Sequence, residues 1–277
     1  MSTDLERAVA QHYGRQDIAG RILDGLKAAG VDLERLEPDD LAPVDEFHIG
    51  GRAATADVLA KLALTGADHV LDVGCGIGGT VRYIARKFGC RVTGIDLTPE
   101  YVEAARHLTE RTGLADHVAF QVASALDLPF QDATFDAAVT FHVAMNIRDR
   151  PRLYAETARV LKPHARFCIY DVMRGDAGSV RFPTPWAETA ATSHLTTPAE
   201  MRELLAQAGF AVQEVEDRTA AGLAFFRQRL AATADGPPPV GLHLLMGPSA
   251  REKFTNMLQS MEAGAIAPVV MIARREH

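Results

Sequence analysis

The sequence predicts an α/β fold in which a mostly parallel sheet is covered by helices on both faces. From residue 69 onward, short apolar stretches typical of buried strands alternate with longer segments that have helical periodicity. Glycine and proline breaks fall inside this alternation and do not separate two larger blocks. With 277 residues, 47% of them hydrophobic, the chain is long enough to bury one large core.

The N-terminal part differs from this alternation. Residues 1–30 have the pattern of one or two helices, prolines and glycines interrupt residues 36–51, and a short helix is expected over 52–63. We therefore expect residues 1–63 to form a helical lid segment on a domain that spans 64–277.

The domain itself should contain seven strands, and helices should connect them. The expected strands are 69–74, 91–95, 117–123, 135–142, 165–172, 211–216 and 268–274. The expected helices are 79–88, 99–112, 149–161, 198–208, 218–233 and 249–263. An irregular stretch over 174–197 is expected to be an insertion that covers the substrate.

Composition excludes several classes of partner. The net charge of −7 and the lack of a dense Lys/Arg tract argue against nucleic acid, which leaves a small molecule as the expected partner. No apolar run long enough to span a membrane and no basic, apolar leader is present, so we expect a cytoplasmic protein. The three cysteines lack the close spacing of metal sites, so we expect buried thiols and no metal. A homodimer is an open alternative to a monomer.

A glycine cluster follows the first expected strand, in the sequence VLDVGCGIGG over residues 70–79. Gly74, Gly76 and Gly79 match the G-x-G-x-x-G pattern, which is found in sites for the pyrophosphate of a dinucleotide. Asp96 lies 20 residues after Gly76, where a carboxylate would bind ribose hydroxyls. These features alone fit either a nicotinamide dinucleotide or another adenosine-containing cofactor.

Asp72 separates the two alternatives. It stands two residues before the first glycine, where its carboxylate would repel a pyrophosphate but attract a cation. S-adenosylmethionine carries a sulfonium and an ammonium group, so Asp72 favours this ligand over a nicotinamide dinucleotide.

Four motifs together resemble the class I S-adenosylmethionine-dependent methyltransferases, over about residues 45–217. They are LDVGCGIGG, VTGIDLTPEYVEAA, LDLPFQDATFDAAVT and ARVLKP. The resemblance implies a Rossmann-like fold and S-adenosyl-L-methionine as cofactor, with S-adenosyl-L-homocysteine as product. Many relatives carry an aspartate at the position of Ser124, and a serine there can still accept a hydrogen bond from adenine. The cofactor-binding residues implied are Asp72, Gly74, Gly76, Gly78, Asp96, Leu97, Ser124, Ala125, Leu126 and Phe141.

The acceptor is less defined than the donor. The segment after the fourth strand lacks the Asn-Pro-Pro-Tyr type of motif found in methylases of adenine or amide nitrogens. Asn146 stands where relatives acting on phosphobases and small amines commonly carry histidine, whereas ubiquinone and menaquinone C-methyltransferases have asparagine. We favour an aromatic, quinone-like or secondary-metabolite acceptor that is attacked through oxygen or carbon.

Other hypotheses about the function stay open. One alternative is N-methylation of a small amine of the glycine or sarcosine type. A nicotinamide-dependent oxidoreductase and a cofactor-binding protein without turnover are further alternatives, the former opposed by Asp72.

Candidate catalytic and substrate residues follow the fourth and fifth strands. His142 and Asp171 are candidate general bases, because each ends a strand at the expected ligand crevice. Each residue also has a purely structural interpretation, His142 as a histidine of the strand and Asp171 as an acidic residue of the turn. The candidate substrate-binding residues are His48, Met145, Asn146 and Trp186.

Overall fold

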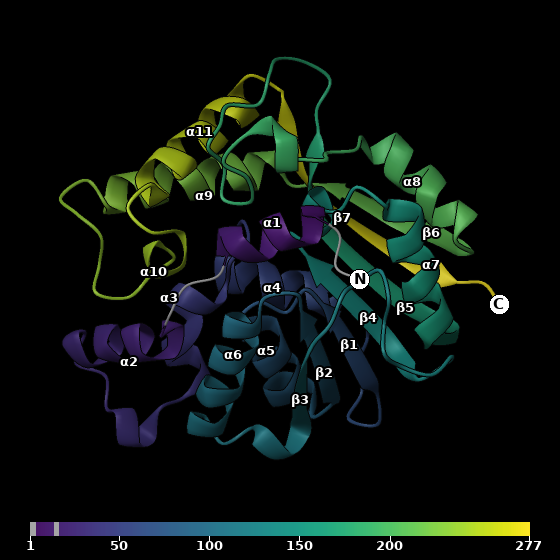
Figure 1. Cartoon of the computed structure of the whole chain (residues 1–277), viewed down its shortest axis with the longest axis horizontal. Helices are drawn as coiled ribbons and strands as arrows, with labels where there is room; N and C mark the ends of the chain where they lie inside the picture. The colour runs from purple at the N-terminus through teal and green to yellow at the C-terminus, as the bar shows by residue number, and fades with distance from the viewer. Residues whose placement is uncertain (1–3, 14–16) are drawn as a thin grey trace.

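The computed structural model describes residues 4–13 and 17–277. Its centre is a seven-stranded sheet in the order β3-β2-β1-β4-β5-β7-β6 (Figure 1). In this sheet β7 runs antiparallel to β5 and β6, and the other neighbouring strands are parallel. The predicted mostly parallel α/β sheet is therefore confirmed. The strands are β1 (His69–Val73), β2 (Arg91–Asp96), β3 (Val118–Val122), β4 (Phe135–Phe141), β5 (Leu161–Arg174), β6 (Phe210–Asp217) and β7 (Ile266–Arg275).

Helices occupy the segments between the strands, close to the predicted bounds. Those of the N-terminal part are α1 (Asp4–Tyr13), α2 (Ile18–Ala28), α3 (Ala42–Asp45) and α4 (Gly51–Ala60). Those of the domain are α5 (Gly79–Phe88), α6 (Pro99–Arg111), α7 (Arg150–Val160), α8 (Pro198–Gln207), α9 (Thr219–Ala232), α10 (His243–Met246) and α11 (Ala250–Glu262).

Local signals set several of these boundaries. Helix α5 begins after Gly78 (φ 87°) and ends at Gly89 (φ 71°), a positive-φ residue of the kind that commonly stops helices. Helix α8 begins with a capping box, in which Thr197 and Glu200 each bind the backbone N–H of the other. Such signals are local, which is why the sequence predicted these helices to within a residue or two.

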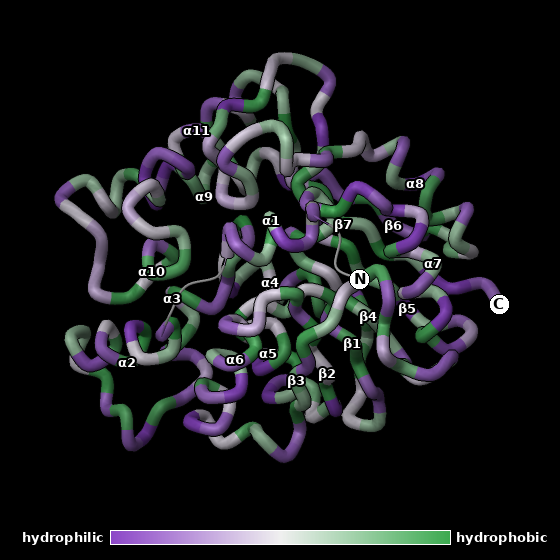
Figure 2. The backbone as a smooth tube through the Cα atoms, in the orientation of Figure 1, coloured by the Kyte–Doolittle hydropathy of each residue, from purple (hydrophilic) through white to green (hydrophobic). Residues whose placement is uncertain are grey.

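Two apolar clusters cover the two faces of the sheet. One contains residues of α4, α5, α9 and α11, and the other contains residues of α7 and α8. Neighbouring residues of β1 are divided between them, because Val70 faces the first cluster and Leu71 the second. In Figure 2 hydrophobic stretches run along the central strands, as expected for a sheet buried on both faces.

The start of one strand differs most from the prediction. Strand β5 begins at Leu161 and not at 165, because Leu161 pairs with Phe135 before a register shift in β4. Helix α4, which the sequence analysis grouped with the N-terminal lid segment, packs in the core through Val58 and Leu59, both fully buried.

Candidate active site

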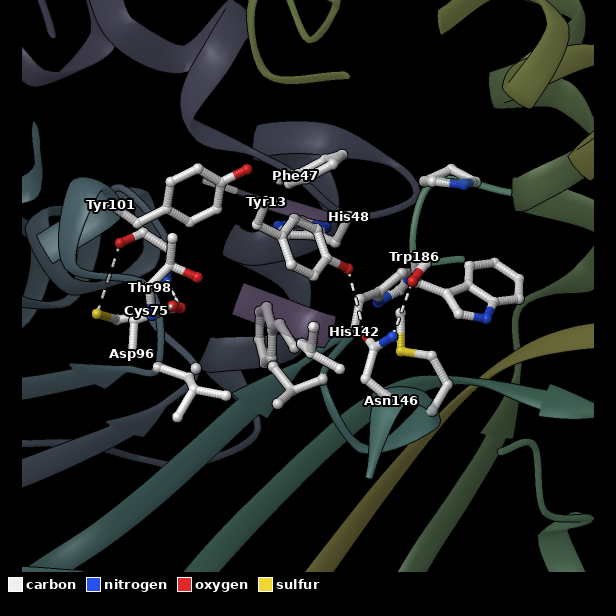
Figure 3. Close-up of a pocket in the computed structure, with 18 of the residues that line it drawn as sticks. Tyr13, Phe47, His48, Cys75, Asp96, Thr98, Tyr101, His142, Asn146 and Trp186 are labelled. Carbon is white, nitrogen blue, oxygen red and sulfur yellow. Dashed lines mark hydrogen bonds between the residues drawn. The ribbon is translucent and has the colours of Figure 1, made fainter. Parts of the chain in front are cut away.

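A cavity of about 400 Å³ opens at the carboxyl ends of β1, β2 and β4. Asp72, Asp96 and Phe141, which end or nearly end these strands, all line it. The strand order reverses between β1 and β4, and ligands of open α/β sheets bind outside such a reversal. Figure 3 shows Asp96, Thr98 and Tyr101 on one side of the cavity, with His142, Asn146 and Trp186 on the other.

Backbone groups fix the carboxylate of Asp96. Its Oδ2 accepts a hydrogen bond from the N–H of Gly76 (2.9 Å), and its Oδ1 accepts one from the N–H of Thr98 (2.9 Å). Burial raises the pKa of Asp96, and these two hydrogen bonds oppose that shift. The carboxylate is thus held in place at the end of β2, where the remaining lone pairs can accept from ribose hydroxyls.

Asp72 is buried among other acids. Its side chain is almost fully inaccessible, and burial raises its pKa to about 8, with Asp96 and Glu46 adding to the shift. A carboxyl group in these surroundings is largely protonated at neutral pH and binds a cation favourably once it ionises. This is the charge preference that a sulfonium or ammonium group would satisfy.

The glycine loop lets backbone approach a ligand. A Cβ atom on Gly74 (φ 82°) would lie 2.3 Å from a side-chain carbon of Val143. A Cβ on Gly76 (φ 53°) would meet nothing closer than the ring of Tyr101 at 4.0 Å, so it would project into the cavity. Both positions need glycine, and together with Asp72 and Asp96 they fit the methionine and ribose parts of S-adenosylmethionine.

The segment after β3 forms the outer end of this region. The N–H of Ala123 donates to the carbonyl of Asp96 (3.1 Å), which holds the segment beside the end of β2. The hydroxyl of Ser124 accepts from the N–H of Leu126 (3.1 Å) and donates to the carboxylate of Glu6 on α1. An N-terminal residue therefore reaches the predicted adenine site.

The other half of the cavity is mostly apolar. Here residues of the loop that follows β5 and of α9, α10 and α11 line the cavity opposite the carboxyl end of β4. The large apolar residues that line this half are Phe47, Ile49, Met145, Trp186, Phe225, Phe226, Leu242, Leu245, Phe254 and Met257. Arg148 is the single arginine or lysine among the described lining residues, and it is exposed.

Helix α1 lies across this half. The hydroxyl of Tyr13 donates to Oδ1 of Asn146 (3.1 Å), and Nδ2 of Asn146 donates to the carbonyl of Trp186 (2.8 Å), as Figure 3 shows. On the same helix, Nε2 of His12 lies 3.1 Å from the carbonyl of Pro185. These contacts join α1 to β4 and to the predicted substrate-covering stretch.

His142 lines the cavity, but both of its ring nitrogens have partners. Its Nδ1 lies 3.1 Å from the carbonyl of Tyr170, and its Nε2 accepts from the N–H of Ile49 (3.3 Å). Burial lowers its pKa to about 3, and the neighbouring His48 adds to the shift. The ring therefore stays neutral at physiological pH and is a weak proton acceptor.

His48 lines the cavity beside His142 and pairs with an acid. Its Nε2 lies 2.8 Å from Oε2 of Glu46 and 2.9 Å from Oγ1 of Thr55. His48 also favours the ionised form of Glu46, whose pKa is lowered although burial opposes that shift. This arrangement fixes the orientation of the imidazole ring.

Two predicted site residues do not line the cavity. Asp171 is 1% exposed and faces Arg150, whose Nη1 lies 4.0 Å from its Oδ2. Because it is not among the residues that line the cavity, we do not assign it to catalysis, although burial raises its pKa to about 7. Gly78 caps α5, and a Cβ there would meet Phe120 and Arg82, so this glycine serves local packing.

The other predicted residues do line the cavity. Those predicted for the cofactor are Asp72, Gly74, Gly76, Asp96, Leu97, Ser124, Ala125, Leu126 and Phe141. Those predicted for catalysis or the acceptor are His48, His142, Met145, Asn146 and Trp186.

Sequence analysis missed the lining residues of α1, namely Glu6, Val9 and Tyr13. They are more than 100 residues from Ser124 and Asn146 in the chain, so no local spacing could reveal their contacts. It also missed Tyr101, although its position one turn into the helix after Asp96 was a usable signal.

Metal and membrane features can be stated for the described residues alone. They contain no group of three or more His, Cys, Asp or Glu residues able to hold a metal ion. Over the same ranges, every helix is too short or too polar to cross a membrane.

Comparisons with known proteins identify the family of this chain. A family model described as "Methyltransferase domain" matches residues 71–169. The chain is 32% identical to O-methyltransferase resE of Aspergillus sclerotiorum over 184 residues, which are 65% of this chain and 68% of the relative. It is 33% identical to O-methyltransferase rstn1 of Aspergillus nomiae over 193 residues, 67% of this chain and 83% of the relative.

The fold is also found in solved structures. Geranyl diphosphate C-methyltransferase from Streptomyces coelicolor, solved with Mg²⁺, geranyl diphosphate and S-adenosyl-L-homocysteine, has a TM-score of 0.73. The alignment covers 99% of this chain and 98% of that one at 21% identity, so it shows the fold. From the two fungal relatives and the glycine-loop site together, this chain belongs to the class I S-adenosylmethionine-dependent methyltransferases that act on small molecules.

Proposed function

We propose that the acceptor is a neutral, largely apolar small molecule that is methylated on oxygen. The single observation that carries this proposal is the apolar, aromatic wall of the acceptor half. Removing the surface of an aromatic acceptor from water is worth about 25 cal/mol per Å². The choice of oxygen is supported by the two fungal O-methyltransferases that resemble the chain.

The charges of the cavity argue against an anionic acceptor. Phosphate and carboxylate groups in buried sites need arginine, lysine or a metal ion as partners. Among the lining acids, Asp45 is paired with Arg82 (2.5 Å) and Asp72 is largely protonated. This leaves Glu6, Asp96 and Asp149 against the exposed Arg148. An acceptor of the glycine or sarcosine type would bring its own carboxylate into these surroundings, so this charge balance disfavours the amine alternative.

The reaction depends mainly on alignment. S-adenosylmethionine, when bound, supplies an electrophilic methyl group on a sulfonium. Asp72 and the glycine loop would hold the cationic end of this cofactor. The apolar wall would pack against the acceptor and position its oxygen beside the methyl group. Holding two reactants in line is worth several orders of magnitude in rate, so a strong base is not required.

A neutral His142 is consistent with this mechanism. With a pKa of about 3 it is a poor proton acceptor at neutral pH. The hydroxyl proton of the acceptor is therefore lost to solvent water and not to His142. We expect acceptors whose hydroxyl ionises readily, such as phenols and enols, to react faster than aliphatic alcohols.

Paired acceptors that differ only in charge test the proposal. The purified protein is incubated with S-adenosylmethionine and either a naphthol or the corresponding hydroxynaphthalene sulfonate, and the product is identified by mass spectrometry and NMR. We expect O-methyl naphthol and at least about tenfold lower kcat/KM for the sulfonate, because a buried anion without a partner is strongly disfavoured. Faster methylation of the sulfonate, of sarcosine or of a ring carbon would contradict the proposal.

A further inference from the structure

The predicted adenine site lacks the aspartate that many relatives carry at the position of Ser124. Asp96 marks the ribose at the end of β2, and β3 is the next strand outward, so the base of the cofactor lies against the segment after β3. The residues of this segment that line the cavity are Ala123, Ser124, Ala125 and Leu126. The segment itself therefore offers no carboxylate to the exocyclic amino group of adenine, which is a hydrogen-bond donor.

Ser124 has little capacity left to accept that amino group. A hydroxyl has one donor and two lone pairs. Its proton goes to Glu6, and one lone pair is used by the N–H of Leu126. A neutral hydroxyl is also a weaker acceptor than a carboxylate.

A carboxylate from another segment, that of Glu6, lies beside Ser124. Its side chain lines the cavity, and its carboxylate lies within hydrogen-bond distance of the Ser124 hydroxyl. The two oxygens of a carboxylate have about four lone-pair positions, so the side chain of Glu6 can accept from more than one donor at the same time. Glu6 belongs to α1, which makes no part of the sheet.

We propose that Glu6 recognises the adenine amino group, and that binding of the adenosyl cofactor thereby holds α1 closed over the cavity. Helix α1 also contacts the acceptor half, through Tyr13 with Asn146 and through His12 with Pro185. One short helix therefore bridges the two halves, and the cofactor adds a contact at the end nearest β3. The inference rests on the donor and is independent of the acceptor class.

The first test measures recognition of the base. Calorimetry gives the affinities of the full chain for S-adenosylhomocysteine and for S-inosylhomocysteine, in which a carbonyl oxygen replaces the amino group. Wild type should prefer the adenosyl ligand, and Glu6→Ala should reduce that preference by about tenfold, through loss of a charged hydrogen bond. Arg7→Gln is the matched control on the same helix, because Arg7 is exposed and pairs with Asp4 (3.2 Å). It should leave the preference unchanged.

The second test separates recognition from closure. In the double variant Glu6→Ala/Ser124→Asp, a carboxylate returns to the site but no longer comes from α1, so the adenosyl preference should be restored. Hydrogen–deuterium exchange of residues 4–13 then reports on the helix. S-adenosylhomocysteine should slow this exchange in wild type and in Arg7→Gln, but in neither variant that lacks Glu6.

Three outcomes would overturn the proposal. An unchanged adenosyl preference in Glu6→Ala would mean that a group other than Glu6 binds the adenine amino group. Full protection of residues 4–13 in the double variant would mean that closure does not depend on Glu6. Absence of S-adenosylhomocysteine binding to wild type would remove the donor itself, whereas failure of every oxygen acceptor would affect only the proposed acceptor class.

Discussion

The two halves of the cavity are built in different ways. The adenosyl half comes from the ends of β1, β2 and β3 and lies almost entirely within residues 72–126. The acceptor half gathers side chains from Val9 on α1 to Met257 on α11. One half is thus assembled from a short run of chain on a rigid sheet, and the other from segments that meet only in the folded protein.

This difference indicates which half of the cavity tolerates amino-acid substitutions. Backbone N–H groups of Gly76 and Thr98 fix the carboxylate of Asp96 in the adenosyl half, so we expect few substitutions to be compatible with that half. The acceptor half is made of apolar side chains on helices and one loop, which can change without disturbing the sheet. We therefore expect related proteins to share the methyl donor and to differ in their methyl acceptors.

The largest effect should follow substitution in the glycine loop. Gly74→Ala adds a Cβ that would lie 2.3 Å from Val143, at a φ of 82° that alanine rarely adopts. We expect S-adenosylhomocysteine binding to fall below detection by calorimetry. Gly113→Ala is the control, because its φ is 70° but nothing lies within 4 Å. It should cost about 1 kcal/mol of stability, with cofactor affinity retained.

Loss of the Asp96 carboxylate, which we expect to bind the ribose, should have the next largest effect. Asp96→Ala should weaken S-adenosylhomocysteine binding by about 1–3 kcal/mol, measured by calorimetry, and leave the acceptor KM unchanged. Asp136→Asn is the control, since Asp136 also accepts from a backbone N–H (His69, 3.0 Å) but lies at the amino end of β4 and lines a separate pocket. Equal affinity of Asp96→Ala and wild type would place the ribose elsewhere.

A substitution in the acceptor half should give the reverse pattern. Phe225→Ala removes apolar surface from the cavity wall, so steady-state kinetics should show an acceptor KM raised about tenfold, for ~1–2 kcal/mol of lost contact. The KM for S-adenosylmethionine should not change. Phe130→Ala, which removes a ring outside this cavity, should lower stability and leave both KM values unaltered. A raised donor KM in Phe225→Ala would show that the two halves are not separate.

Asp72 should give a smaller, thermodynamic signal. With a pKa of about 8 it is mostly protonated at pH 7, and a cationic ligand favours the carboxylate, so binding should release up to one proton. Calorimetry in two buffers of different ionisation enthalpy measures this, and Asp72→Asn should abolish the release. Because the folded pKa is raised, ligand-free protein should lose stability as the pH rises from about 4 through 8. Proton uptake on binding would contradict this assignment.

The smallest effect concerns His142. Its pKa of about 3 lies below the ordinary value, so the folded protein loses stability as the pH falls from about 6.5 toward 3. The same shift means that the pH–rate profile should have no limb near 6.5 due to this residue. His142→Asn, which tolerates the φ of 56°, should keep the shape of the profile. A limb near 6.5 that disappears in the variant would restore His142 as a general base.

Much of the fold was predictable because its signals are local. Helix α5 was predicted with the bounds that the structure has, since glycines stand at both of its ends. The start of β5 was not, because pairing of Leu161 with Phe135 depends on a partner strand. The burial of Val58 in α4 was not predictable for a similar reason, since it depends on packing against the rest of the core.

By itself, the sequence determined the alternation of strands and helices, the glycine loop and the acids at the ends of β1 and β2. These features depend on neighbours a few residues away or on the common edge that parallel strands share. Only the tertiary structure decided that Asp171 lies outside the cavity, that His142 has both nitrogens engaged, and that Glu6 reaches Ser124. Contacts between segments more than 90 residues apart follow from packing of the whole chain, and no local pattern encodes them.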